Sequence, residues 1–302
     1  MRAARVLLAG VLVSLLLAGC GADQAGGGAG KATRSDRLVD FSKKPPYVNA
    51  LDIDPQTKDF LLTTNRGFWR IDPRGDAVKQ VTGNISARGR TATVGTFLDL
   101  LVTGPRHLIG SGHPDRQGTL PSFLGFIESD DGGRNWQVIS RLGEADLHKI
   151  VLRHDRMYAF DAVLGAMLIS SDGGKTFTER FTPPELIIDF EVDPSDPDRI
   201  LASSQRRLFR TTDGGKRWRP IQEGDGTRLA WPAPKALYRA QADGTIEVSD
   251  SGGGAFKPVG KVAGEPYKFK AVGADHLYLA LSDGAILETT DGGKTWKDVF
   301  RP

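Results

Sequence analysis

Polar side chains of the types used in catalysis stand at a few isolated places in this sequence. Asp99, His148 and Asp189 each follow an apolar residue in a β-rich run, and His113 and Asp115 lie in a segment rich in glycine. Imidazole and carboxylate groups act as general acids and bases, and both ligate divalent metals. These residue types therefore suit a hydrolase site, a pocket for a polar ligand, or a metal site with His113 and His148 as its candidate ligands.

The elements that must position these residues follow from an internal repeat. An octapeptide of the type Ser/Thr-x-Asp-x-Gly-x-Thr-Trp/Phe occurs four times, and a degenerate copy at 249–256 completes a spacing of about 40 residues. Asp-x-Gly predicts a tight turn whose carboxylate accepts backbone N–H groups, while the aromatic residue packs beneath the turn. The residues given this structural role are Asp131, Gly133, Trp136, Asp172, Gly174, Phe177, Asp213, Gly215, Trp218, Asp291, Gly293 and Trp296.

Each repeat contains short β-rich runs separated by turn residues, which is the pattern of a propeller blade. The sequence therefore predicts an all-β protein, a β-propeller of six four-stranded blades. The six units span residues 45–84, 85–140, 141–180, 181–221, 222–260 and 261–302. A seventh blade does not fit into residues 35–44, but this segment can add a strand to the last blade and close the ring.

The repeat alignment places Asp99, His148 and Asp189 at equivalent positions at the start of the innermost strands, facing the mouth of a central channel. The second unit carries extra residues at 110–121, between its second and third strands. Such a loop emerges opposite the octapeptide turns, and insertions on one face of a repeat array often mark the binding face. We therefore expect a ligand site there, made by the five polar residues. Alternatively, the aspartates cap neighbouring backbone and the His-Pro-Asp loop is a rigid turn.

The N-terminus predicts export and a lipid anchor. Arg2 and Arg5 precede an apolar run, and Leu17-Ala18-Gly19-Cys20 resembles the bacterial lipobox, in which the cysteine is lipidated. We expect a signal peptide at 1–19, a tether at 20–36, and one propeller domain at 37–302. The predicted location is extracytoplasmic, anchored through lipidated Cys20 to the outer face of the bacterial cell membrane.

Composition excludes several classes of protein. The chain has 302 residues, of which 25% are charged, and a single cysteine, so it forms no intrachain disulfide and no cysteine-based metal site. Removing the signal peptide lowers the formal net charge from +3 to +1, and no basic stripe is present. The sequence therefore predicts no nucleic-acid partner. We expect a monomer, with a divalent metal as the one candidate cofactor.

The octapeptide resembles that of the BNR/Asp-box repeat family, and the resemblance covers nearly the whole chain after the tether. It implies a β-propeller, in a family that includes sialidases and a photosystem II assembly factor. The runs at 111–115, 125–129 and 143–148 look like those of actinobacterial sialidase-like lipoproteins described as glycosyl hydrolases. The degenerate copy at 249–256, and a first unit with Ile71-Asp72-Pro73-Arg74-Gly75 in place of the octapeptide, depart from the family pattern.

A typical sialidase activity is not expected from these residues. The resemblance implies an arginine triad and a tyrosine nucleophile, yet the nearest match to the first arginine motif is Phe68-Trp69-Arg70-Ile71. Tyr158, Tyr238 and Tyr278 occupy equivalent positions in their units, as repeated core residues do. Trp231 suits either a sugar-stacking platform or the core.

The sequence thus favours a cell-surface protein that binds a glycan, a small polar ligand or an envelope protein. One alternative is a glycoside hydrolase acting on glycoconjugates, with Asp99, Asp115 and Asp189 as candidate catalytic groups, since carboxylate separation decides that chemistry. The second alternative is an extracytoplasmic assembly factor, by analogy with the photosystem protein.

Overall fold

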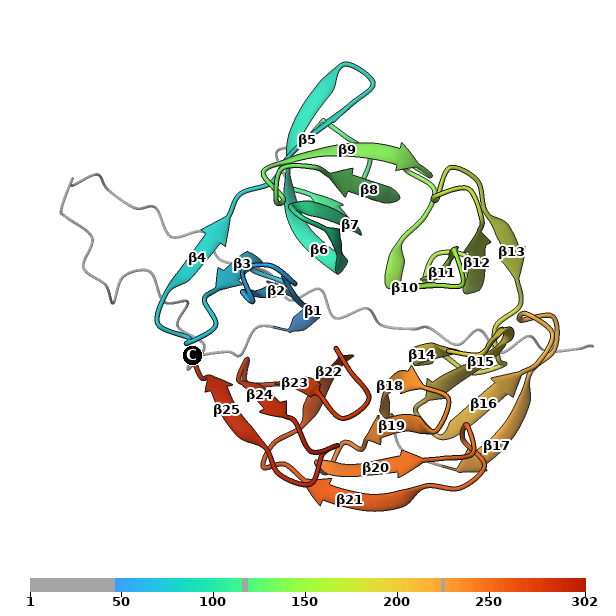
Figure 1. Ribbon diagram of the computed structural model, residues 1–302. Coiled ribbons are helices and arrows are strands. Elements are labelled where there is room, and N and C mark those ends of the chain that lie inside the picture. Colours follow the sequence, from blue (N-terminus) through green and yellow to red (C-terminus); the bar gives the residue numbers. More distant parts are fainter. Residues whose placement is uncertain (1–46, 116–118, 224–225) are drawn as a thin grey trace, which may run out of the picture.

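The computed structural model describes residues 47–115, 119–223 and 226–302. In these residues the protein consists of β-strands arranged as sheets around a ring (Figure 1). No helix among them has the length and apolar character needed to cross a membrane. The predicted signal peptide, Cys20, the tether and the proposed closing segment at 35–44 lie outside the described residues.

Five of the sheets are four-stranded antiparallel meanders, in which consecutive strands pair. The first contains β1 (Val48–Ile53), β2 (Phe60–Thr64), β3 (Gly67–Ile71) and β4 (Val78–Val81). The next two contain β10 (Leu147–Arg153), β11 (Arg156–Asp161), β12 (Ala166–Ser170) and β13 (Thr178–Arg180), and then β14 (Ile187–Asp193), β15 (Asp196–Ser204), β16 (Arg207–Thr211) and β17 (Arg219–Glu223). The last two contain β18 (Arg228–Ala233), β19 (Ala236–Ala240), β20 (Thr245–Ser249) and β21 (Lys257–Lys261), and then β22 (Pro266–Ala271), β23 (Leu277–Leu281), β24 (Ile286–Thr289) and β25 (Lys297–Phe300).

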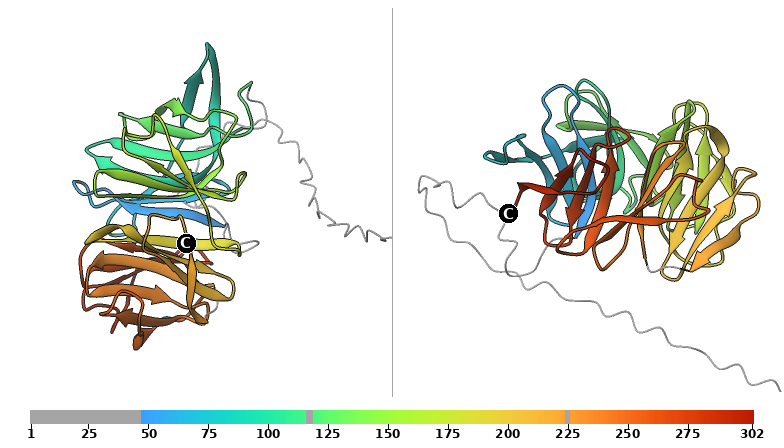
Figure 2. Two further views of the ribbon diagram at one scale, coloured as in Figure 1. Left: turned by 90° about the vertical axis from the view of Figure 1, so that its right-hand side faces the viewer. Right: turned by 60° about the horizontal axis from the view of Figure 1, so that its bottom comes forward.

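The remaining strands form a closed barrel instead of an open sheet. They are β5 (Asn84–Ala87), β6 (Arg90–Gly104), β7 (His107–Pro114), β8 (Phe126–Ser129) and β9 (Asn135–Ser140). The first part of the long strand β6 pairs with β5, which in turn pairs in parallel with the outer strand β9. The β5–β6 hairpin projects outward from the ring in Figures 1 and 2.

The prediction of six four-stranded blades is therefore wrong, because only five sheets in the described residues have four strands. The physical reason is the connection after β4, which turns back through Arg88 and Gly89, both with positive φ, to make an extra hairpin. This hairpin lengthens β6 and gives β9 a second partner. The predicted units nevertheless end within three residues of the last strand of each sheet and begin within six residues of its first strand.

The repeated octapeptide forms the same turn at each copy. In the copy at 170–177 the Ser170 hydroxyl donates to Asp172 Oδ1 over 2.8 Å and accepts from Gly174 N over 2.9 Å. Asp172 Oδ1 also accepts the backbone N–H of Thr176 over 3.0 Å. The degenerate copy keeps the hydroxyl contact, because Gly253 N donates to Ser249 Oγ over 3.0 Å, while Ser251 Oγ accepts one backbone N–H in place of the carboxylate.

The second glycine of the turn is required by close approach to the preceding sheet. A Cβ atom on Gly174 would lie 2.5 Å from Phe126 of β8, and one on Gly133 would lie 2.5 Å from Phe68 of β3. Both glycines have positive φ, which side-chain-bearing residues rarely adopt. At these two turns the octapeptide thus packs its own sheet closely against the one before it.

The core lies between neighbouring sheets. Tyr158, Tyr238 and Tyr278 take equivalent places on the second strands and are all buried, so the prediction that they are repeated core residues is confirmed. The hydroxyls of Tyr158 and Tyr238 donate to carbonyls of Pro197 and Ala274, each in the next sheet along the chain. Trp231 is also a core residue, 1% exposed, and packs in a cluster with four buried leucines.

Replacing the buried hydroxyl of one turn tests its structural role. Thr211→Val removes the acceptor for Gly215 N and the donor to Asp213 Oδ1 without changing the shape of the side chain. We expect the free energy of unfolding to fall by about 1–3 kcal/mol, because a buried N–H loses its partner. Urea denaturation measures this change. Thr176→Val, at the exposed end of a neighbouring turn, is the matched control, with an expected effect of about 0.5 kcal/mol or less. Equal losses in the two variants would contradict the role assigned to the buried hydroxyl.

Candidate functional site

The first strand of each open sheet and β6 of the barrel stand around the central channel (Figure 1). Each of these inner strands contacts the next, and β22 contacts β1, so the described residues close the ring. In five of the six strands a β-bulge shifts the pairing with the second strand at the same place. The residue directly after each bulge pairs with the equivalent position of the second strand, so these residues lie at the same height along the channel axis.

Six residues share that level around the channel. Each pairs with the equivalent residue of its second strand, and the six are Ala50, Asp99, Lys149, Asp189, Arg228 and Lys268. The prediction that His148 is equivalent to Asp99 and Asp189 is therefore wrong by one residue. The bulge between Leu147 and Lys149 leaves His148 as the extra residue, and puts Lys149 between the two aspartates instead.

Lys149 is held by carboxylates of the next sheet. Its Nζ lies 2.9 Å from Asp189 Oδ1 and 3.3 Å from Glu191 Oε1. Burial alone would lower the pKa of Lys149, but the charges of Asp189, Glu191 and Asp99 outweigh it and hold the pKa well above its usual range. Burial raises the pKa of Asp189, but Lys149 and the N–H of Leu229 bring it below its ordinary value. One ammonium group and three carboxyl groups thus lie together inside the channel.

The carboxylates of the inner strands also hold neighbouring backbones together. Asp99 accepts the N–H of Leu100 over 3.0 Å and that of Ile150, on the next inner strand, over 2.5 Å. Asp189 makes the same pair of bonds, to Phe190 N over 2.9 Å and to Leu229 N over 3.0 Å. Asp52 repeats the arrangement with Ile53 and Val102. The alternative in which the aspartates cap neighbouring backbone thus describes their contacts.

Asp115 does not join the other two candidate catalytic aspartates. Its backbone N–H donates to Thr93 O over 2.8 Å, near the outer end of the β6–β7 hairpin. Thr93 precedes Asp99 by six residues on β6, a separation of about 20 Å along an extended strand. Asp99 and Asp115 therefore do not form the facing pair of carboxylates that a glycoside hydrolase uses.

A cavity of about 270 Å³ lies in the channel. Its wall includes charged side chains of Asp99, Lys149, Arg153, Glu191, Lys268 and Lys270. Apolar residues of five inner strands complete it, and its lining runs from the shared level of the ring to the last residues of β10 and β22. The wall of the cavity thus combines charged and apolar side chains.

This cavity reaches the end of the channel at which the inner strands finish. The octapeptide turns lie at the same end, because Gly132 N donates to Arg106 O and Gly214 N donates to Asp198 O, beside the turns that follow the inner strands. The binding site was expected at the opposite end, where the inserted loop emerges. The sequence does not show that the cavity lies at this end, since its lining residues belong to regular inner strands without an insertion or motif.

The opposite end carries a separate polar cluster centred on Asp146. His113 Nε2 lies 3.3 Å from Asp146 Oδ1, and His148 Nε2 lies 3.1 Å from Asp146 Oδ2. His113 Nδ1 lies 2.8 Å from the carbonyl of Ser122. The structure thus brings the two histidines to one carboxylate, away from Asp115. Asp146 was missed, although its place two residues before His148 on a strand-forming run puts both on one face.

Protonation of His113 is coupled to this contact. The hydrogen bond and charge of Asp146 outweigh burial and raise the pKa of His113 above its ordinary value. Burial would raise the pKa of Asp146, but His113 and His148 bring it far below its usual range. Asp146 Oδ1 is buried and has no other hydrogen-bond partner. The cluster therefore ties the inserted segment to β10 by an ion pair.

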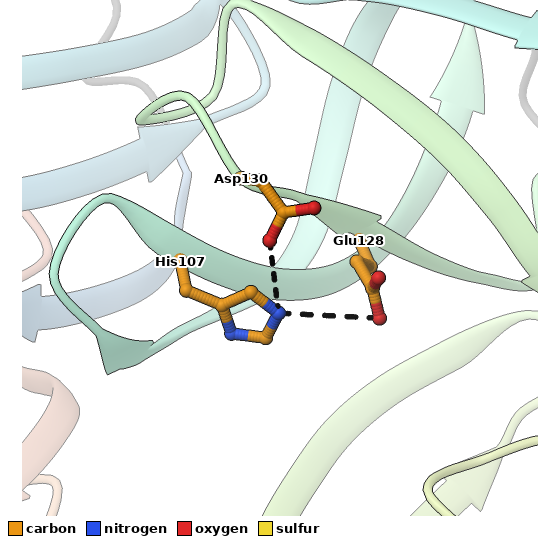
Figure 3. Close-up of side chains that lie close together, drawn as sticks. All are labelled: His107, Glu128 and Asp130. Carbon is orange, nitrogen blue, oxygen red and sulfur yellow. Dashed lines mark ion pairs between the residues drawn. The ribbon is translucent and has the colours of Figure 1, made fainter.

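In the described residues one group brings three metal-ligating side chains within 4.8 Å of one another, namely His107, Glu128 and Asp130 (Figure 3), and the cluster at Asp146 is not such a group. His107 Nε2 lies 3.5 Å from Asp130 Oδ1 and 4.0 Å from Glu128 Oε2. Asp130 is 72% exposed, and Glu128 also accepts from Gln137. This arrangement is accounted for by surface ion pairs. The metal role of His113 and His148 stays a prediction.

Comparison with known proteins places the fold. No family model matches the chain. Solved structures similar to it include YCF48 from Cyanidioschyzon merolae, with a TM-score of 0.50 and 14% identity, covering 84% of each chain. YCF48 bound to D1 peptide gives a TM-score of 0.55 at 14% identity, covering 80% of this chain and 78% of that one. The fold is a β-propeller. An ancestral GH74 enzyme shares the propeller over 80% of this chain and 36% of its own, with a TM-score of 0.52 and 13% identity.

Curated relatives match a shorter stretch of the propeller chain. Photosystem II assembly lipoprotein Ycf48 of Trichormus variabilis is 28% identical over 116 residues, and that of Picosynechococcus is 32% identical over 105 residues. Each match covers 32% of this chain and 31% of the relative. The chain thus spans about a third of the length of the curated relatives it matches.

The inter-blade role of Asp99 can be tested by two substitutions. Asp99→Ala leaves the buried N–H groups of Leu100 and Ile150 without a hydrogen-bond acceptor. We expect the free energy of unfolding to fall by about 2–4 kcal/mol in urea denaturation, while Asp99→Asn, which keeps one amide oxygen, loses less. Asp250→Ala, at an exposed position, is the control and should change stability little. Equal stability of the alanine variant and the wild type would show that Asp99 does not hold β10.

The ion pair between His113 and Asp146 predicts a pH dependence of stability. Because the folded state raises the pKa of His113 above 6.5, its stabilising ion pair is complete below pH 6.5 and is lost as the pH rises through the folded-state pKa. We expect the melting temperature of the wild type to decrease over that interval. His113→Asn and Asp146→Asn should both flatten this part of the profile. If both variants keep the wild-type slope of melting temperature against pH, the ion pair between His113 and Asp146 does not stabilise the fold.

Proposed function

We propose that this propeller is an extracytoplasmic lipoprotein that binds a segment of a partner polypeptide in its central cavity. The observation that carries the proposal is the cavity itself, whose wall combines charged side chains with apolar ones such as Ile150 and Phe269. Binding pockets of this kind use apolar surface for affinity and a few polar groups for orientation. A polypeptide offers both kinds of group in one extended ligand.

The comparisons support a protein partner more than a glycan. The curated relatives are named as assembly lipoproteins, and one similar solved structure is described as YCF48 bound to D1 peptide. We carry over only the class of ligand, since the matched stretch is short and no residue of this chain points to photosynthesis. This favours the assembly-factor alternative of the sequence analysis over the glycan-binding one.

The contacts in the channel give less support to a glycoside hydrolase. Asp99 and Asp189 accept backbone N–H groups with both oxygens, and Asp115 lies on a different part of the barrel. The ring of Trp231 is buried, so it offers no face for stacking on a sugar. The likeness to GH74 covers about a third of that enzyme and concerns the fold.

Membrane attachment and family membership belong to the same proposal. The lipobox at Cys20 supports a lipid anchor, as do the lipoprotein names of the relatives. The hydrogen bonds shared by the octapeptide turns support membership of the Asp-box repeat family. The finer likeness to actinobacterial sialidase-like lipoproteins is supported by the sequence runs alone.

Site-specific cross-linking in the native envelope tests this function and its location. A photoreactive benzoylphenylalanine replaces Ala271, at the end of the cavity lining, in the full-length anchored chain. We expect an adduct with one defined polypeptide, identified by mass spectrometry. The same group at Val163, exposed on the β11–β12 turn of the opposite face, is the matched control and should give no such adduct.

The two positions separate the competing hypotheses. An adduct from Val163 but not from Ala271 would move the site to the face with the inserted loop. Adducts from neither position, with hydrolysis of aryl glycosides by the same preparation, would overturn the polypeptide-binding function in favour of the enzyme.

A further inference from the structure

The ring of six residues at the shared level of the channel has an uneven distribution of charge. Asp99, Lys149 and Asp189 alternate in sign around one side. Arg228 and Lys268 then follow each other directly, and the next member, Ala50, is apolar. Two cations therefore adjoin on this side of the channel, with no acidic ring residue between them or after them.

The other lysines in the cavity wall already have counter-ions. Lys149 lies against Asp189 and Glu191, as described above, and Lys270 Nζ lies 2.8 Å from Asp52 Oδ1. Lys268, in contrast, makes no ion pair or hydrogen bond with any group in the described part of the chain. Its ammonium group lines the cavity without a carboxylate in ion-pair contact, and the charges of Asp99 and Asp189 act on it from across the channel.

The neighbouring arginine does not take up that role. The guanidinium of Arg228 stacks over the ring of Tyr267 at 5.0 Å, and its Nη1 donates to the carbonyl of Ile188 over 3.4 Å. Its Nε is buried without a hydrogen-bond partner. Neither of the two adjoining cations therefore makes an ion pair with a carboxylate in the described part of the chain.

We infer that the cavity accepts a carboxylate group of the partner polypeptide against the ammonium group of Lys268. This inference rests on the proposed function and names the group that the cavity recognises. A singly charged carboxylate matches one ammonium that has no ion-pair partner. A doubly charged phosphate suits the cavity less, because Asp99 and Glu191 also line its wall and would repel it.

Charge also explains why Lys268 is tolerated unpaired in the free protein. Burial lowers the pKa of Lys268, while the carboxylates of Asp99 and Asp189 act against this shift across the channel. An unpaired ammonium in such a place costs stability that a bound anion restores. Removing the charge should therefore leave the fold intact and remove the recognition of the ligand.

Small blocked amino acids provide the probes. N-acetyl-leucine carries a terminal carboxylate, N-acetyl-glutamic acid α-amide carries a side-chain carboxylate, and N-acetyl-leucinamide carries no charge. Ligand-observed NMR measures their dissociation constants with the detergent-solubilised full-length protein. We expect at least one carboxylate probe to bind about tenfold or more tightly than the amide, as a charge-assisted hydrogen bond predicts. The preferred probe tells a chain terminus from an acidic side chain.

Substitution of the lysine completes the test. Lys268→Met should remove the preference for the carboxylate and leave the melting temperature unchanged or higher. Lys261→Met, at an exposed lysine paired with Asp243, is the matched control and should bind as the wild type does. Retained preference in Lys268→Met, or no preference in the wild type, would overturn the role of Lys268.

Failure of this inference can be told apart from failure of the proposed function. Cross-linking from Ala271 that persists in Lys268→Met at the wild-type level would overturn the carboxylate contact while leaving the polypeptide-binding function in place. Loss of that cross-linking in the folded Lys268→Met protein supports the contact.

Discussion

Neighbouring sheets of this propeller are joined both near the periphery and near the axis, and the ring depends on these contacts. Near the periphery, the second glycine of an octapeptide turn approaches the preceding sheet too closely for a Cβ atom at Gly133 and Gly174. Near the axis, Asp52, Asp99 and Asp189 bond both to their own strand and to the next inner strand. A four-stranded sheet cannot bury both of its faces alone, so these ties and the apolar contacts between sheets act together.

The inner ties also determine what the channel can bind. The aspartates that join the strands place negative charge at the axis, and Lys149 and Lys270 neutralise part of it. The channel therefore contains a connected set of ion pairs with a cavity beside them. We infer that recognition in such a place depends on Lys268, a cavity lysine without an ion pair in the described residues, and not on the residues that hold the ring.

The parts of the structure that repeat were predictable from the sequence, and the irregular parts were not. The spacing of the octapeptides predicted the turns, the unit limits and the buried tyrosines, because each turn imposes the same hydrogen bonds. The inner-strand register was wrong at His148 because a bulge adds a residue without any change in residue type. The barrel was missed because β5 is only four residues long. Lys268 was missed because its importance lies in a partner that it lacks, which only the surrounding strands reveal.

The outer strands of the five open sheets each leave one edge without a partner strand in the described residues. Such edges invite intermolecular strand addition. Pro220 in β17 and Pro258 in β21 each remove a donor from that edge. In the barrel the outer strand β9 is protected differently, because β5 pairs with its first three residues, Asn135 to Gln137. The hairpin that breaks the symmetry of the ring thus shields one sheet edge from pairing with a second molecule.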